Sequence, residues 1–293
     1  MKLGRPLKLT VATPSGPAEI LLELDPTKYT QRDMRNQMTA VGVYDRATTG
    51  VLLRVLRPGD TFVDVGAHIG VHSLLASRLV GESGAVVAIE GDEENFQHLR
   101  HHKTLNHAEN ITPIHCVVSD SPGTRTFWKN SDNDGGHTVY DAGAHPVNKL
   151  SRANPKPTEV QAETLDRLVQ QYETASPKVI KVDAEGGDHD VLRGSSTLLD
   201  GRTTPFVVAE INEFGLSKLG SSQMRFREYM LGHGYATFVP RGDGSRPARI
   251  PDDYRIQTDE EFPVFNVLFA CQEDVLTYWP EPPQGGPLAE NQK

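Results

Sequence analysis

The chain has 293 residues, 37% of them hydrophobic and 24% charged, which is enough for a sizeable core in one elaborated α/β domain. Its 39 acidic residues outnumber its 30 basic residues, so the chain as a whole does not attract a phosphate backbone, and we expect no nucleic-acid partner. No apolar run is long enough to span a membrane. Two cysteines, Cys116 and Cys271, and an N-terminus without an apolar leader core predict a cytoplasmic protein.

Two segments come before the main pattern of the chain. Residues 7–24 alternate apolar and polar side chains around a Pro-Ser-Gly-Pro break, which predicts a small hairpin. Residues 29–56 gain helical spacing toward their end, which closes at Pro58. We therefore expect residues 1–57 to form an N-terminal extension made of a hairpin and helices.

A strand–helix–strand pattern begins with "TFVDVG" at Thr61. Apolar runs of strand length alternate with stretches of helical spacing, and this predicts a parallel sheet that is covered on both faces and binds ligands at the carboxyl ends of its strands. The expected strands are 61–66, 85–90, 111–120, 178–186 and 205–212.

The second half of the chain departs from that regular pattern. Two extra strands, 124–128 and 158–165, flank a polar loop over 130–157, and we expect an insertion over 124–160 that acts as a lid. The last two apolar runs, 235–239 and 262–271, have no ordinary crossover helix between them and should pair antiparallel. The predicted main domain is 58–271, followed by a flexible tail over 272–293.

The first turn of the main domain is Gly66-Ala67-His68-Ile69-Gly70. It has two glycines where a dinucleotide site usually has three, so one close approach to a pyrophosphate is missing. Glu90, at the end of the second strand, has the position of an acid that binds ribose hydroxyls. These features predict S-adenosylmethionine, which contains a ribose but no phosphate, although the glycines could also serve only turn geometry and packing.

Four other residues are expected to complete the cofactor site. Asp64 would face the ammonium group of the cofactor or an ordered water molecule, and Ser119 and Asp120 would lie beside the adenine. Gly91 follows Glu90 and would contribute backbone contacts.

Four stretches of the sequence, in order, resemble the FkbM family of S-adenosylmethionine-dependent methyltransferases. They are "FVDVGAHIGVHSLLAS", "VVAIEGDEENFQHLRHHKTLN", "ETLDRL" and, most specifically, "VIKVDAEGGDHDVLRG". The resemblance implies a class I methyltransferase fold, which is Rossmann-like and doubly wound, with a seven-stranded, mostly parallel sheet and an antiparallel final strand. His68 and Gly91 depart from it, because the family more often has Asn and Pro at these two positions.

The resemblance also implies O-methylation of a small molecule, with a hydroxyl of a sugar or of a polyketide or related natural product as the acceptor. A homodimer would be ordinary for such an enzyme. Two other classes of function remain open at this point: a nicotinamide-dependent oxidoreductase, whose ribose Glu90 could equally bind, and a non-catalytic cofactor-binding subunit.

Polar residues end two neighbouring strands: the acids Asp183 and Glu185 follow one, and Glu210 and the amide Asn212 end the next. Three hypotheses explain them. In the first, Glu185 and Asp188 cap the following helix and Glu210 accepts backbone hydrogen bonds. In the second, Asp183 or Glu185 orients or deprotonates the acceptor hydroxyl, helped by His137 from the lid. In the third, Asp183, Glu210 and Asn212 hold a divalent cation such as Mg²⁺.

We expect five other histidines to be solvated. His98, His101, His102 and His107 lie on a polar helix, and His189 should face solvent on the helix after the fourth strand.

Overall fold

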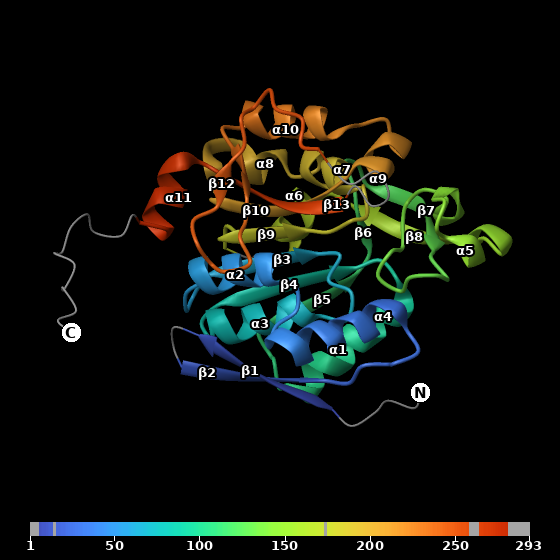
Figure 1. Ribbon diagram of the computed structural model, residues 1–293, viewed down its shortest axis with the longest axis horizontal. Coiled ribbons are helices and arrows are strands. Elements are labelled where there is room, and N and C mark those ends of the chain that lie inside the picture. Colours follow the sequence, from blue (N-terminus) through green and yellow to red (C-terminus); the bar gives the residue numbers. More distant parts are fainter. Residues whose placement is uncertain (1–5, 14–15, 173–174, 258–263, 281–293) are drawn as a thin grey trace, which may run out of the picture.

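A computed structural model describes residues 6–13, 16–172, 175–257 and 264–280 of the chain. Its centre is an eight-stranded sheet with helices on both sides (Figure 1). In spatial order the strands are β12 (Ala248–Arg249), β11 (Ala236–Val239), β13 (Val264–Ala270), β10 (Phe206–Asn212), β9 (Val179–Val182), β3 (Thr61–Val65), β4 (Ala85–Glu90) and β5 (Ile111–His115).

The directions of the strands follow the prediction. From β5 to β10 every neighbouring pair is parallel, whereas β13 runs antiparallel to both β10 and β11. The expected pairing of the last two apolar runs is thus confirmed for the described residues. The two-residue strand β12 pairs with β11 and adds an eighth strand to the seven that were expected.

Alternate side chains of the strands enter two separate cores, one on each face of the sheet. On β3, Phe62 belongs to one core and Val63 to the other. The first core includes residues of α2 (Arg46–Val55), α3 (Val71–Val80) and α4 (Glu93–Leu105). The second includes residues of α6 (Leu165–Gln171), α7 (Asp188–Arg193), α8 (Ser196–Leu199) and α10 (Gln223–Gly232).

Burial on both faces explains why the strands read as continuous apolar runs in the sequence. In the part of the chain that the structure describes, no helix combines the length and the apolar character needed to cross a membrane.

The N-terminal segment packs onto the first core. β1 (Leu7–Thr13) and β2 (Gly16–Leu22) form the expected antiparallel hairpin, and their buried side chains join the core of α3 and α4. α1 (Tyr29–Val41) follows and buries Met34 and Met38 in the same core.

His102 on α4 contradicts the expectation that the histidines of this helix are solvated. It is fully buried, its Nδ1 donates to the carbonyl of Ile69 over 2.8 Å, and its Nε2 accepts from the Glu23 N–H over 3.0 Å. Burial lowers the pKa of His102 to about 4, so the ring is neutral. His98 is buried as well. The sequence showed a polar helix but not that the hairpin would cover it.

The two strands expected at the insertion, β8 (Lys156–Glu163) and β7 (Gly123–Lys129), form a separate sheet with β6 (Val117–Val118), in the order β6-β8-β7. The expected strand 111–120 is thus divided between β5 of the central sheet and β6 of this sheet. Both extra strands therefore exist, and β7 and β8 pair antiparallel. The connection between them contains a 3₁₀ turn, η1 (Ala142–Ala144), and α5 (Lys149–Ala153). A second 3₁₀ turn, η2 (Asp200–Arg202), follows α8, and α9 (Glu213–Lys218) follows β10.

The sequence predicts a flexible tail from residue 272, which is too early. Gln272–Tyr278 forms α11, and Val275 and Trp279 are buried in the first core. Two apolar side chains four residues apart on one helical face account for this packing. The remainder of the predicted tail, 281–293, lies outside the described residues.

We expect His102→Leu to lower the free energy of unfolding, because it leaves the Glu23 N–H and the Ile69 carbonyl buried without partners, at a cost of about 1–3 kcal/mol for each group. Urea denaturation would measure the change. His101→Leu is the matched control, since the adjacent His101 side chain is 46% exposed and should change stability by about 0.5 kcal/mol or less. Equal effects of the two substitutions would contradict the assigned role of His102.

Candidate active site

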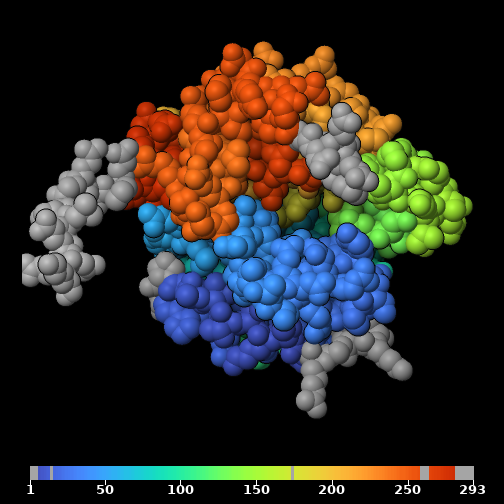
Figure 2. Space-filling model, viewed as in Figure 1, coloured from blue at the N-terminus to red at the C-terminus, as the bar shows by residue number. Residues whose placement is uncertain are grey.

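A cavity of about 280 Å³ lies at the carboxyl ends of the central parallel strands. It is lined by the first turn, by the ends of β4 and β10, by the residues that follow β9, and by parts of α1 and of the insertion. Figure 2 shows a hollow between the N-terminal helical segment in blue, the C-terminal segment in orange and the insertion in green. A ligand at the strand ends was the expectation from a parallel sheet.

The two glycines of the first turn are required by their surroundings. Gly66 has a φ of 74°, and a Cβ there would lie 1.9 Å from the carbonyl oxygen of Asp183. Gly70 has a φ of 90° and begins α3, and a Cβ there would lie 2.5 Å from Leu99. Between them, Ala67 lines the cavity. The turn is thus the tight entry from β3 into α3 that the sequence predicted.

Glu90 ends β4 beside this turn and lines the cavity. One carboxylate oxygen accepts from the His68 N–H over 2.8 Å, and the other accepts from the Asp92 N–H over 2.7 Å. Burial raises the pKa of Glu90. Gly91, the next residue, also lines the cavity, and a Cβ there would come within 3.0 Å of Val117. The structure therefore brings Glu90 and the turn together.

Asp64 does not face a ligand, contrary to the prediction. Its side chain is fully buried and accepts from the Ser73 hydroxyl over 2.6 Å and from the Lys181 ammonium over 3.2 Å. Lys181 lies opposite Asp64 in the register of β3 and β9. Burying a carboxylate is costly unless the charge is paired, and Lys181 on the neighbouring strand provides that pairing.

Lys181 was not identified from the sequence, although a lysine within the apolar run "VIKV" was a usable signal. Its ammonium group lies 3.3 Å from the Asp183 carboxylate and donates to the Gly66 carbonyl over 3.3 Å. Burial opposes this charge, but the carboxylates of Asp64 and Asp183 outweigh the effect and raise the pKa of Lys181. Lys181 thus joins the first turn to the acids after β9.

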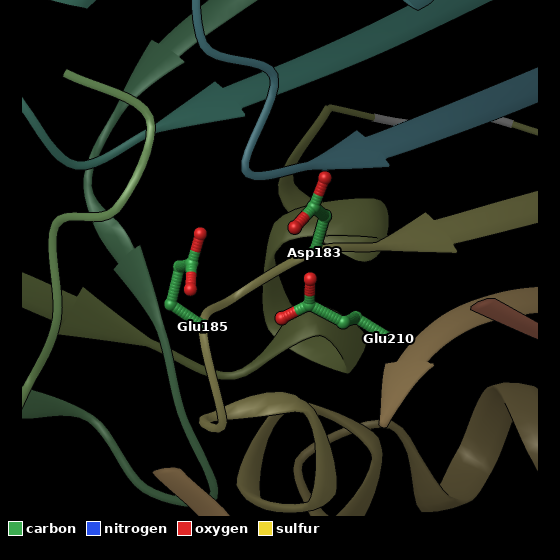
Figure 3. A group of neighbouring side chains, drawn as sticks. All are labelled: Asp183, Glu185 and Glu210. Carbon is green, nitrogen blue, oxygen red and sulfur yellow. The ribbon is translucent and has the colours of Figure 1, made fainter. Parts of the chain in front are cut away.

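Asp183, Glu185 and Glu210 form a cluster that lines the cavity, and one carboxylate oxygen of each lies within 4.8 Å of one oxygen of the other two (Figure 3). Burial and the neighbouring carboxylates raise the pKa of Glu185 to about 8 and raise the pKa of Glu210 well above its usual range. Within the described chain, Oε2 of Glu210 is buried without a hydrogen-bond partner. The structure thus brings together the acids at the ends of two neighbouring strands.

Asp188 and Asn212 hold this cluster in place. The fully buried Asp188 carboxylate accepts backbone N–H groups of Ala184 and Gly186, before α7, and of Glu210 on β10. Asn212 uses its amide oxygen to cap α9 and donates to Glu185 over 3.3 Å. The amide oxygen of Asn212, which was proposed as a cation ligand, is therefore already engaged.

His137 is placed differently from the prediction. Its Nδ1 accepts from the Asn130 N–H over 2.9 Å, and its Nε2 lies 3.9 Å from Asp92, whereas none of its hydrogen bonds reaches Asp183, Glu185 or Glu210. Burial lowers the pKa of His137 to about 4, so the ring is neutral. It lines the cavity but has no free lone pair with which to act as a base.

The structure also places three further residues whose positions were predicted from the sequence. Ser119 is buried and lines the cavity as expected, but the Asp120 carboxylate lies 2.7 Å from Arg193 instead. His189 does not simply face solvent. It stacks on Phe226 with ring centroids 5.3 Å apart, and burial lowers its pKa to about 4.

Tyr44 and His72 line the cavity and were missed by the sequence reasoning. Their ring centroids are 5.8 Å apart, and Nε2 of His72 is buried without a hydrogen-bond partner among the described residues. Burial lowers the pKa of His72 and raises that of Tyr44. Helical periodicity could place His72 on α3 but could not show that it lines a cavity.

A parallel sheet in this strand order, with β13 antiparallel and a ligand-sized cavity beside the first glycine turn, is the class I methyltransferase fold. The model of the family described as Methyltransferase FkbM domain matches residues 64–237, more than half of the chain. This chain therefore belongs to the FkbM methyltransferase family. The match favours methyl transfer over the nicotinamide-dependent alternative.

Among curated proteins, the Hexuronic acid methyltransferase AglP of Haloferax volcanii is 26% identical over 182 residues. This alignment spans 62% of the present chain and 64% of that relative. Similar solved structures include a methyltransferase FkbM from Methylobacillus flagellatus, with 15% identity, a TM-score of 0.42 and coverage of 81% of this chain and 60% of that one. An O-methyltransferase from Bacillus cereus in complex with SAH has 12% identity, a TM-score of 0.42 and coverage of 82% and 88%.

We expect Glu90→Gln to weaken S-adenosylhomocysteine binding, because a neutral amide replaces a buried carboxylate whose charged hydrogen bonds are worth about 1.5–3 kcal/mol each. Isothermal titration would measure a dissociation constant at least about tenfold higher than that of the wild type. The control is Glu93→Gln, because Glu93 is close by on α4 but does not line the cavity. Wild-type affinity in Glu90→Gln would refute the assignment of Glu90 to the cofactor.

Proposed function

We propose that this protein transfers a methyl group from S-adenosylmethionine to a hydroxyl group of a small, hydroxyl-rich acceptor such as a sugar or a natural-product scaffold. The observation that carries the proposal is the cluster of Asp183, Glu185 and Glu210 in the same cavity as the Gly66 turn and Glu90. Membership of a methyltransferase family supports the transfer, and the name of the Haloferax relative, which refers to a sugar acid, supports the acceptor class.

The residues at the strand ends fit S-adenosylmethionine. The turn after β3 runs so close to β9 that only glycine is accommodated at position 66. Glu90 presents a buried carboxylate for ribose hydroxyls, and Ser119, which the sequence predicts to lie beside the adenine, lines the same cavity. When bound, this cofactor supplies an electrophilic methyl group on a positively charged sulfur.

The acid cluster is suited to removing the proton of an acceptor hydroxyl. A general base works best when its pKa lies near the working pH, and burial raises the pKa of Glu185 to about 8. Asp183 is held by Lys181, and its side chain is 43% exposed, so it can orient the acceptor at the cavity surface. The Asn212 amide donates to Glu185 over 3.3 Å and helps to hold it in place.

The other walls of the cavity support a polar acceptor. Tyr44, Asp33 and Thr30 from the N-terminal segment line it together with His72. Hydroxyl, carboxylate and imidazole groups in a small number of positions are what fixes the orientation of a hydroxyl-rich ligand.

We expect Glu185→Gln to reduce turnover by about 10²–10⁴-fold while leaving S-adenosylhomocysteine affinity near that of the wild type, because only proton removal is lost. Production of S-adenosylhomocysteine would be measured over a panel of free sugars, uronic acids and sugar nucleotides. The control is Glu228→Gln, an exposed position on α10. Unchanged turnover in Glu185→Gln would contradict the catalytic placement.

The wild-type rate should also depend on pH in a defined direction. A base must be deprotonated to act, and the pKa of Glu185 is about 8, so turnover should rise with pH and level off above about 8. A pH–rate profile of the wild type and of Glu185→Gln would show whether the rise belongs to this residue. A rate that is flat from pH 6 to 9 would rule out Glu185 as the base.

A divalent cation such as Mg²⁺ is a second use that three clustered carboxylates allow, because hard oxygen ligands suit this ion. Turnover of EDTA-treated protein distinguishes the two. Full activity without metal supports proton removal by the carboxylates, whereas activity that requires added Mg²⁺ would assign the cluster to the cation.

A further inference from the structure

We propose that Asp134, in the insertion, is a positioning residue that fixes the cofactor-binding turn through His68; this inference rests on the proposed function. Its carboxylate contacts two other parts of the chain. Oδ1 accepts from the Thr30 N–H over 2.6 Å, and Oδ2 accepts from the Gln31 side chain over 3.3 Å and lies 3.3 Å from Nε2 of His68. One side chain thus connects the insertion, α1 and the first turn.

The surroundings of Asp134 keep it in place and charged. Its side chain is only 6% exposed, and its backbone carbonyl accepts from the Asn95 amide on α4 over 2.9 Å. Burial alone would raise the pKa of Asp134, but the facing His68 ring and the hydrogen bonds from Thr30 and Gln31 outweigh it and lower the pKa to about 2. The carboxylate is therefore ionised at any working pH.

His68 needs such a partner because of its backbone conformation. Its φ of 52° lies in the left-handed region, which residues other than glycine rarely adopt. In this conformation the His68 N–H points at the Glu90 carboxylate, 2.8 Å away. The contact between the His68 ring and Asp134 holds the residue in that conformation. Asp134 therefore acts on Glu90 indirectly, through His68.

Asp134 and the next residue, Gly135, both contact Thr30 of α1, which forms a wall of the cavity. The Gly135 N–H donates to the Thr30 hydroxyl over 3.0 Å, and a Cβ at Gly135 would lie 2.8 Å from that hydroxyl. Tyr29, Asp33 and Met34 of α1 line the cavity next to this contact. Asp134 therefore ties a wall of the cavity to the cofactor turn, so that both should be disturbed when it is changed.

The test uses Asp134→Asn, which keeps the size of the side chain and an oxygen for the Thr30 N–H but removes the charge that faces His68. Isothermal titration with S-adenosylhomocysteine should show a dissociation constant about tenfold higher than that of the wild type, the order of effect of one charged hydrogen bond. Asp132→Asn is the matched control. Asp132 is two residues away, but its carboxylate accepts from Leu150 and Ser151 in α5. Its dissociation constant should change by less than about twofold.

A double-substitution cycle shows whether Asp134 acts through His68. Asn adopts the left-handed conformation more readily than most residues, so in a His68→Asn background the turn should depend less on Asp134. Adding Asp134→Asn there should raise the dissociation constant by less than about threefold. A full tenfold effect in both backgrounds would overturn the proposed route through His68. If the role of Asp134 were purely structural, His68→Asn would not reduce the effect of Asp134→Asn on the dissociation constant.

The outcomes separate this inference from the proposed function. A wild-type protein that fails to bind S-adenosylhomocysteine refutes the proposed function, and the inference falls with it. A wild type that binds, together with an Asp134→Asn variant that binds equally well, refutes only the inference. Should Asp134→Asn fail to fold, His68→Ala removes the same contact from the other side and must weaken binding at least about tenfold, since alanine also strains the left-handed turn. Wild-type affinity of that variant would overturn the inference.

Discussion

The buried ammonium group of Lys181 is the contact on which the rest of the cavity depends. It lies between the carboxylates of Asp64 and Asp183 and also reaches the carbonyl oxygen of Gly66. Burying a charge is costly unless it is paired and hydrogen-bonded, and here the pairing joins neighbouring positions of β3 and β9. The first turn and the acids after β9 therefore share one ion cluster.

Further contacts connect this ion cluster to the other parts of the chain that line the cavity. Gly66 approaches Asp183 too closely for any side chain, and Asp188 binds backbone N–H groups on both sides of the acid cluster. On the β4 side, Glu90 accepts from the first turn, and Asp134 joins that turn to α1. Segments far apart in sequence thus converge on a single cavity, as the arrangement of the elements in Figure 1 allows.

The sheet, the glycine turn and the meeting of the acids could be predicted because each follows from a local pattern. Apolar runs mark buried strands, and the acids stand at strand ends that parallel pairing brings to one edge. The partners of polar groups could not be predicted in this way. Asp64 was assigned to a ligand, His137 to catalysis and His102 to solvent, yet each is bound by a group more than five residues away that no periodicity reveals.

Replacing the buried ion pair by uncharged residues tests this account most directly. In Asp64→Asn/Lys181→Met both charges are removed together, which should leave the protein folded because no buried charge is left unpaired at position 64. Titration with S-adenosylhomocysteine should then show affinity reduced by at least about tenfold, because the Gly66 turn and Asp183 lose their common anchor. Wild-type affinity in a folded double variant would show that the cofactor turn is held independently of Lys181.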